Sequence, residues 1–266
     1  MKLPPEIEME SELEQSTRVR IIDLNVDICD HASVIRRIAE LVRRGTGGYA
    51  CFSTVHMVME SHDNPEYGAK VNAADIVIPD GMPLVWMQKM LGQKDAARVR
   101  ANDLMIMLCR YASENGLNVG FYGGKQEVIN AIIVRAKIEL PDLYIAYAYS
   151  PPFRPLTDEE DAKITSDIRE SGAQILFMGL GCPKQENWMA AHKDKLNSVM
   201  LGVGASFDFY GGNVKESPEW LGVLGLEWLF RLTQEPKRLW RRYLILNPRF
   251  MWLAMLQLSG IKKFKR

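Results

Sequence analysis

Short apolar segments alternate with amphipathic segments along most of the chain. Seven segments have the length and composition of β-strands: residues 19–28, 49–55, 75–79, 118–123, 143–149, 174–180 and 198–207. Between them, apolar residues recur at helical spacing, which predicts helices over residues 32–44, 102–115, 126–140, 158–171 and 183–197. This alternation predicts a Rossmann-like α/β fold with a largely parallel sheet and helices on both faces.

The alternation stops in the C-terminal part, where the sequence predicts two or three helices with breaks near Pro236 and Pro248. We therefore divide the chain into a flexible N-terminal arm (1–16), an α/β catalytic domain (17–216) and a helical C-terminal appendage (217–266). The arm is acidic and poor in bulky apolar residues, a composition typical of flexible segments.

The charge of the chain is balanced overall but uneven along its length. The 33 basic residues match 33 acidic ones, so the whole molecule has no field that attracts polyanions. The basic residues gather near the C-terminus, where tryptophans and apolar residues lie among them. Because the chain has no apolar run of ~20 residues and no secretory signal, we expect a cytoplasmic protein. The four scattered cysteines favour buried thiols over a metal site.

Two predicted strands end in residues that can carry out chemistry, at the edge where parallel sheets bind ligands. Thr54 and His56 lie at the end of the predicted strand over residues 49–55. Asp80 lies between Pro79 and Gly81, directly after the predicted strand over residues 75–79. A carboxylate at a strand end can act as a general base, although Asp-Gly also forms ordinary turns. His56 can hydrogen-bond a substrate or cap the helix that follows.

Two later strands end in glycine-rich turns before helices. Gly123 and Gly124 of FYGGKQ allow backbone amides to approach a phosphate, and GLGCPKQE, with Gln185 and Glu186, repeats the arrangement. Together the turns favour a nucleotide diphosphate. Because GxGxxG and Walker motifs are absent, plain tight turns remain an alternative.

Two other segments offer polar groups for a ligand. RVRANDLM contains Arg100, Asn102 and Asp103, and Asn102 can also simply cap a helix. Asp208 of GVGASFDFYGG can accept hydrogen bonds from a ligand, or the glycines around it only form a turn. Since no DxD-like or HExxH spacing occurs, we expect neither a metal nor a cofactor.

Taken in order, these segments resemble the WecG/TagA/CpsF family of glycosyltransferases. The resemblance rests on STVHM, PDGMPLVW, RVRANDL, FYGGK, GLGCPKQE, GVGASFDFYGG and LEWLFRLTQEPKRLWRRY. It implies a metal-independent, inverting enzyme that moves a sugar from a UDP-sugar to a polyprenyl-diphosphate-linked saccharide in cell-surface polysaccharide biosynthesis. The donor sugars of the family are N-acetylmannosamine, its uronic acid and glucose.

The resemblance also implies roles for individual residues. It makes Asp80 the general base and places Thr54, His56 and Gln185 at the donor pocket. Without a metal, arginines must offset the negative charge that grows on the departing UDP, and guanidinium groups suit a diphosphate. The candidates in the C-terminal appendage are Arg231, Arg238, Arg241 and Arg242.

The sequence departs from many family members at three places. His56 stands where many have asparagine, Ala101 and Asn102 where many have glycine and serine, and Glu216 and Ser217 where many have a basic residue. The identity of the donor sugar therefore does not follow from the resemblance.

We interpret the C-terminal appendage as both a lid and a membrane contact. EWLFRLTQEPKRLWRRY is expected to fold over the donor diphosphate, and LILNPRFMWLAMLQLSGIKKFKR to lie on the inner face of the cell membrane or to pack as a core helix. Two alternatives are a non-catalytic nucleotide or nucleic-acid binding protein and an NAD-dependent oxidoreductase. The balanced charge argues against a nucleic-acid partner, and the missing glycine fingerprint against the oxidoreductase. The sequence leaves homo-oligomerisation open.

Overall fold

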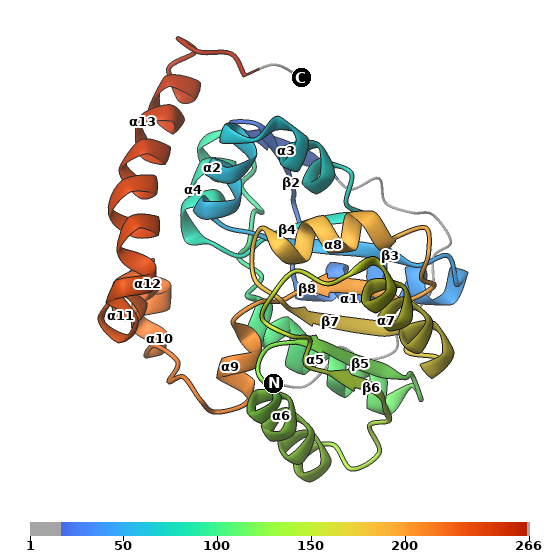
Figure 1. Cartoon of the computed structure of the whole chain (residues 1–266). Coiled ribbons are helices and arrows are strands. Elements are labelled where there is room, and N and C mark those ends of the chain that lie inside the picture. Colours follow the sequence, from blue (N-terminus) through green and yellow to red (C-terminus); the bar gives the residue numbers. More distant parts are fainter. Residues whose placement is uncertain (1–16, 265–266) are drawn as a thin grey trace.

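The computed structural model describes residues 17–264, so the predicted N-terminal arm (1–16) lies outside the described residues. A six-stranded parallel sheet forms its centre, in the strand order β4-β3-β8-β7-β5-β6 (Figure 1). The strands are β3 (Gly48–Ser53), β4 (Ile76–Pro79), β5 (Val119–Gly123), β6 (Ile145–Tyr149), β7 (Ile175–Gly179) and β8 (Val199–Gly202). This arrangement confirms the predicted Rossmann-like α/β fold.

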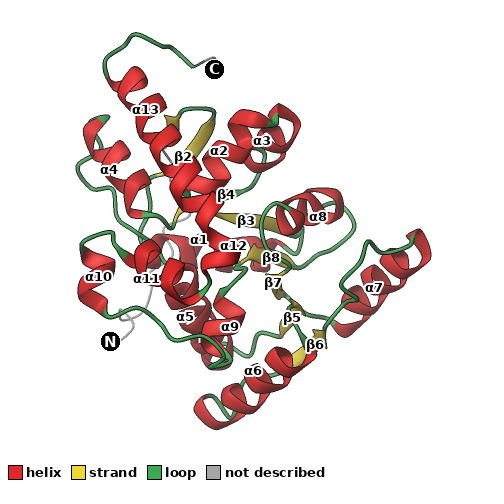
Figure 2. Ribbon diagram, turned by 60° about the vertical axis from the view of Figure 1, so that its left-hand side comes forward, coloured by secondary structure: helices red, strands yellow, loops and turns green. Residues whose placement is uncertain are grey.

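Helices cover both faces of the sheet (Figure 2). One face carries α1 (His31–Arg44), α5 (Ala101–Glu114), α6 (Gln126–Glu139) and α9 (Ser206–Tyr210). The other carries α2 (Val55–Asp63), α3 (Pro65–Asn72), α4 (Met82–Met90), α7 (Asp158–Ser171) and α8 (Lys184–His192). Strand β7 shows why both faces are covered, because Ile175 and Phe177 enter one core while Leu176 and Met178 enter the other.

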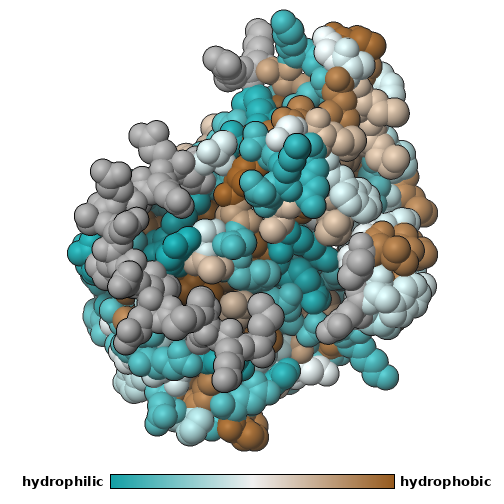
Figure 3. Space-filling view, turned by 180° about the vertical axis from the view of Figure 1, so that it is seen from behind, coloured by the Kyte–Doolittle hydropathy of each residue, from teal (hydrophilic) through white to brown (hydrophobic). Residues whose placement is uncertain are grey.

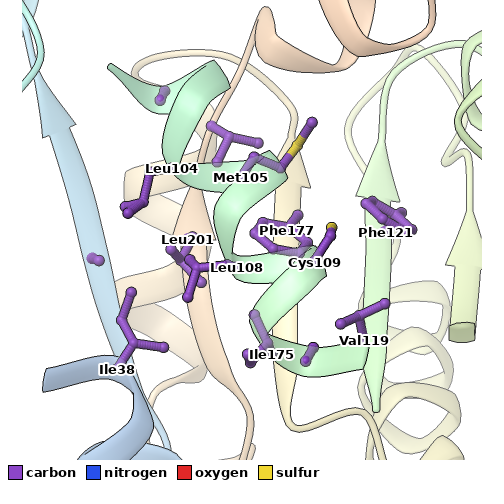
Figure 4. Close-up of a cluster of buried hydrophobic side chains, with 14 of the residues drawn as sticks. Ile38, Leu104, Met105, Leu108, Cys109, Val119, Phe121, Ile175, Phe177 and Leu201 are labelled. Atoms are coloured by element: carbon purple, nitrogen blue, oxygen red, sulfur yellow. The ribbon is translucent and has the colours of Figure 1, made fainter. Parts of the chain in front are cut away.

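The core beneath α5 is closely packed. Figure 4 shows Leu104, Leu108 and Cys109 of this helix among side chains of β5, β7 and β8. The rings of Phe121 and Phe177 stack there with centroids 5.5 Å apart. Each large apolar side chain buried in this way contributes about 1.5–3 kcal/mol, so these contacts hold the helix and the sheet together.

The first predicted strand, residues 19–28, is wrong as a single strand. It forms an antiparallel hairpin of β1 (Arg18–Ile21) and β2 (Leu24–Asp27), which lies outside the central sheet. Ile21 and Ile22 are both fully buried, although neighbours in one strand point to opposite sides. A turn at Ile22, whose φ is 57°, lets both side chains enter the core.

The last predicted strand, residues 198–207, is also too long. Strand β8 ends at Gly202, and Ser206 begins the short helix α9. The predicted helix 183–197 is shorter as well, since α8 ends at His192. Small and apolar residues continue past the end of β8, whereas α8 is followed by the mostly charged and polar residues 193–197.

The C-terminal part is helical, as predicted. Its elements are α10 (Glu219–Val223), α11 (Glu227–Gln234), α12 (Pro236–Arg241), the π-helical turn η1 (Arg242–Leu246) and α13 (Asn247–Leu258). The break near Pro236 is confirmed, but the break near Pro248 is not, because η1 continues directly into α13. The π-helical turn changes the hydrogen-bonding pattern just before the proline, where the chain stays helical.

One side of α13 packs on the rest of the protein. Phe250, Leu253 and Ala254 are buried in the core that also contains α2 and the hairpin. Gln257 joins α13 to the hairpin, because its Nε2 donates to the Arg20 carbonyl at 2.7 Å and its Oε1 accepts from the Ile22 amide at 2.8 Å. These contacts hold the C-terminal helices beside the sheet.

Candidate active site

A pocket lies where β3 and β4 end, between the sheet and the C-terminal helices. It is lined by Thr54, Val55, His56, Asp80, Gly81, Met82, Pro83, Arg98, Gly225, Glu227, Trp228, Arg231, Arg242, Tyr243 and Asn247. Five of the residues predicted for the site are among these: Thr54, His56, Asp80, Arg231 and Arg242. The structure thus brings two strand ends and two C-terminal arginines into one cavity.

Asp80 is held at the pocket through its backbone. Its amide donates to the Ser53 carbonyl at 3.0 Å, which ties it to the end of β3, and its carbonyl accepts a hydrogen bond from Nε of Arg98. Burial raises the pKa of the Asp80 carboxyl above its usual range; Arg98 opposes this rise and Glu227 adds to it. A carboxylate with raised proton affinity is suited to act as a general base.

Arg98 and Glu227 were not predicted as site residues. Nη2 of Arg98 lies 2.8 Å from Oε2 of Glu227 and 3.8 Å from Oδ1 of Asp80. Burial favours the neutral form of Glu227, but Arg98 and Arg100 outweigh it and hold its pKa below the usual range. For Arg98 the available signal was its place in the sequence RVR, where two arginines flank an apolar residue, whereas no local pattern pointed to Glu227.

Thr54 and His56 lie at the start of α2. Thr54 occupies the N-cap position, so the alternative in which His56 caps the helix is wrong. Oγ1 of Thr54 accepts a hydrogen bond from Nη2 of Arg242 at 3.2 Å. Burial and the charge of Arg242 lower the pKa of His56 to about 4, and its Nδ1 is buried without a hydrogen-bond partner. His56 is therefore neutral near pH 7, and its imidazole can accept a hydrogen bond from a ligand or donate one to it.

The four predicted arginines fall into two pairs. Arg231 and Arg242 line the pocket, where Nε of Arg231 is buried without a partner and burial lowers the pKa of Arg242. Arg238 and Arg241 are exposed; the first pairs with Glu235, and the second lies 6.0 Å from the ring of Trp240. Of the four predicted arginines, the first pair thus brings positive charge to the pocket, which Arg98 also lines.

Gln185 and Glu186 lie outside the lining of this pocket. Nε2 of Gln185 donates to the Gly202 carbonyl at 2.7 Å and to Oε1 of Glu186 at 2.8 Å. Glu186 also accepts a hydrogen bond from the Tyr67 hydroxyl at 3.2 Å, and burial raises its pKa. These bonds connect α8 to the end of β8 and to α3.

Gly123 and Gly124 follow β5, also outside the pocket lining. Both have positive φ, 117° and 72°. A Cβ atom on Gly123 would lie 2.6 Å from the carbonyl carbon of Gly179, so β5 and β7 approach too closely for any side chain. The close contact of two backbones is enough to require glycine at Gly123.

Replacing Gly123 with alanine should therefore destabilise the fold by about 2 kcal/mol, through the backbone clash and the unfavourable φ. Gly92→Ala is the control, because Gly92 also has a positive φ, 97°, but no atom lies within 4 Å of the position that a Cβ would occupy there. We expect a loss of about 1 kcal/mol for the control. Urea unfolding measures both values, and equal losses would contradict the clash.

The remaining predicted residues are not among those that line the pocket. Arg100 pairs with Asp103 at 3.4 Å and with Glu216 at 3.2 Å. Asn102 donates to Glu216 at 2.7 Å and lies within the first turn of α5, so the capping alternative for this residue is wrong. Asp208 lies on α9, where burial raises its pKa and the charge of Arg238 opposes that rise.

Residues 17–264 contain neither a cluster of metal ligands nor a membrane-spanning helix. No group of three or more His, Cys, Asp or Glu side chains lies close enough together in this part of the chain to hold a metal ion. None of the helices described there is both long and apolar enough to cross a membrane.

The chain is similar in sequence to known glycosyltransferases. The profile of the glycosyl transferase WecG/TagA/CpsF family matches residues 19–263. A Bacillus spizizenii protein named N-acetylglucosaminyldiphosphoundecaprenol N-acetyl-beta-D-mannosaminyltransferase is 32% identical over 199 residues, 74% of this chain and 75% of the relative. A Bacillus subtilis protein of the same name is 27% identical over 200 residues, 75% of each chain. These matches confirm the resemblance that the sequence motifs indicated.

Proposed function

Because the chain belongs to the WecG/TagA/CpsF family of glycosyltransferases, we propose that it moves a sugar from a UDP-sugar to a polyprenyl-diphosphate-linked saccharide. The product would serve in the biosynthesis of a cell-surface polysaccharide. The observation that carries this proposal is the pocket in which Asp80 faces Arg231 and Arg242. It combines a candidate base with cations that suit a diphosphate.

The proposed reaction is a direct displacement without a metal ion. Asp80 takes the proton of the acceptor hydroxyl, and the hydroxyl oxygen attacks the anomeric carbon of the donor. The attack comes from the side opposite the UDP oxygen, and the bond between the carbon and that oxygen breaks. The anomeric configuration therefore inverts. Arg231 and Arg242 offset the charge that grows on the departing UDP.

The remaining residues of the site would bind the donor. We assign this role to Thr54 and His56 in the pocket and to a set outside its lining, which comprises Arg100, Asn102, Asp103, Gly123, Gly124, Gln185, Glu186 and Asp208. Arg238 and Arg241 are assigned to the diphosphate or the acceptor. Because these last two are exposed, this role requires their side chains to turn toward the pocket when substrate binds.

The names of the relatives guide the choice of substrates. Both specify an N-acetylmannosaminyl group and an N-acetylglucosaminyl-diphosphoundecaprenol acceptor. N-acetylmannosamine is therefore the first donor sugar to test, with its uronic acid and glucose as the rivals. A panel of these three UDP-sugars, assayed for UDP release with a short-chain polyprenyl-diphosphate acceptor, identifies the donor. Release from none of them would refute the proposed function.

We further propose that residues 17–216 form the catalytic domain and that 217–266 act as its lid and membrane contact. Support comes from the side of α13 that faces away from the core. Met251, Trp252 and Met255 are exposed there, and Trp252 has 57% of its surface accessible. In Figure 3, apolar side chains gather along the right-hand edge, where α13 runs. The enzyme would then lie on the cytoplasmic face of the membrane that holds its acceptor.

A double substitution, Trp252→Glu with Met255→Glu, should reduce binding to anionic vesicles at least about tenfold, because it removes apolar area and adds repelling charge. Ile138→Glu is the control, since Ile138 is also an exposed apolar residue but lies on α6. Vesicle sedimentation measures the binding. Equal binding by the double variant and the wild type would refute the membrane contact.

The alternative of a nucleic-acid binding protein gains little from the structure. Arg231 and Arg242 face the pocket, and Arg249 pairs with Asp63 at 2.6 Å. Several basic residues of the C-terminal part are thus directed inward or neutralised instead of forming an open basic surface.

A further inference from the structure

Asp80 and Glu227 share one guanidinium group. Nε of Arg98 donates to the Asp80 backbone carbonyl, which anchors the arginine beside the candidate base. Its Nη2 then lies 2.8 Å from the Glu227 carboxylate but 3.8 Å from the Asp80 carboxylate. The charge of Arg98 is therefore paired closely with Glu227 and only loosely with Asp80.

We propose that Glu227 is a positioning residue that keeps the guanidinium of Arg98 from pairing with the Asp80 carboxylate. This inference rests on the proposed function, in which Asp80 accepts the proton of the acceptor hydroxyl. It assigns Glu227 a role in the chemistry that acts through Arg98.

The balance of charge around Asp80 explains why such a residue is needed. The charged or titratable groups that face Asp80 or line its pocket are Arg98, Arg100, Arg231, Arg242, His56, Tyr243 and Glu227. The arginines favour the ionised form of Asp80 and so weaken it as a base. Because burial lowers the pKa of His56, the imidazole is neutral and adds no charge. Glu227 is the carboxylate of the group, and it opposes the arginines.

Glu227 reaches Asp80 from a distant part of the chain. It is the first residue of α11, whereas Asp80 follows β4 and Arg98 precedes α5. Oε2 of Glu227 also lies 3.8 Å from Nε of Arg100, so one carboxylate contacts both arginines of this segment. The proton affinity of Asp80 thus depends on the position of α11 as well as on its own strand.

Glu227→Gln tests the inference, because glutamine keeps the shape of the side chain and removes its charge. In the free protein, the titration of the Asp80 carboxyl can be followed by carbon NMR, with Asp80→Asn used to assign the signal. We expect the titration midpoint in Glu227→Gln to move to lower pH, since Arg98 is released to pair with Asp80. Turnover at pH 7 should fall about tenfold, as the base weakens.

Glu216→Gln is the matched control. Glu216 also comes from the C-terminal part and pairs with Arg100, at 3.2 Å. Its second contact is with Asn102, at 2.7 Å. Glu216→Gln therefore removes a charge beside Arg100 and Asn102, whereas Arg98 keeps its close partner Glu227. We expect the Asp80 titration to stay unchanged in this variant. Far-UV circular dichroism and the melting temperature show whether each variant is folded.

The outcomes separate this inference from the proposed function. An unchanged Asp80 titration in folded Glu227→Gln overturns the inference, even if the wild-type protein transfers sugar and loses that activity with Asp80→Asn. Equal shifts in Glu227→Gln and Glu216→Gln also overturn it, because the effect would then be one of net charge. A shift in Glu227→Gln alone supports the positioning role, whereas transfer that persists in Asp80→Asn refutes the base itself.

Discussion

Asp80→Asn should lower the rate of sugar transfer by about 10²–10⁴-fold and leave the affinity for UDP close to that of the wild type. Asparagine keeps the size of the side chain but cannot take the proton of the acceptor hydroxyl. The backbone of residue 80 should stay in place, because its hydrogen bonds to Ser53 and Arg98 use main-chain atoms. The loss should therefore appear in kcat, with little change in the fold.

Steady-state transfer kinetics and calorimetric titration with UDP measure the two quantities. Asp95→Asn is a suitable control, since Asp95 is an exposed carboxylate in the connection between α4 and α5, outside the pocket lining. It should retain full activity. The loss of a general base should slow transfer by about 10²–10⁴-fold. A rate for Asp80→Asn within about twofold of the wild type would therefore contradict this role of Asp80.

Arg242→Gln should reduce kcat by about 10²–10³-fold, the usual effect of removing one group that stabilises charge in a transition state. The guanidinium lies in the pocket and donates to Thr54 at 3.2 Å, which fixes its direction. Since the charge on the UDP oxygens is largest as the bond breaks, kcat should fall more than donor affinity.

The comparison is with Arg249→Gln, further along the C-terminal helices. Arg249 pairs with Asp63 at 2.6 Å on the surface and does not line the pocket. Its loss should change kcat by less than about twofold, as expected for an exposed ion pair. Equal effects of the two substitutions would show that Arg242 acts only through general charge or stability.

Much of the α/β architecture could be predicted because local patterns determine it. Strand ends in a parallel sheet share one edge, so the sequence alone indicates that Thr54 and Asp80 lie at a common site. The hairpin was missed because apolar residues recur along the whole of residues 19–28, and the turn falls at Ile22, a β-branched residue that rarely adopts a positive φ. The small residues after Gly202 likewise fit either a strand or the turn into α9.

The interactions inside the site were harder to predict, because they join distant segments. Arg98 and Glu227 are 129 positions apart, and no local pattern indicates that they pair. Arg231 and Arg238 belong to the same basic stretch, yet only the first lines the pocket, because helix orientation decides which side chains face inward. The motif position of Gln185 suggests that it binds a ligand. In the structure, however, its side chain donates to the Gly202 carbonyl and to Glu186 and accepts from the Gly181 amide.

Transfer from UDP-N-acetylmannosamine to a short-chain polyprenyl-diphosphate-linked N-acetylglucosamine tests the central claim most directly. Mass spectrometry follows the acceptor, and NMR determines the anomeric configuration of the product, with a chelator present to remove metal ions. We predict that the acceptor gains one sugar, that one UDP is released for each sugar transferred, and that the configuration is inverted. An acceptor that stays unmodified with every UDP-sugar of the panel would contradict the claim.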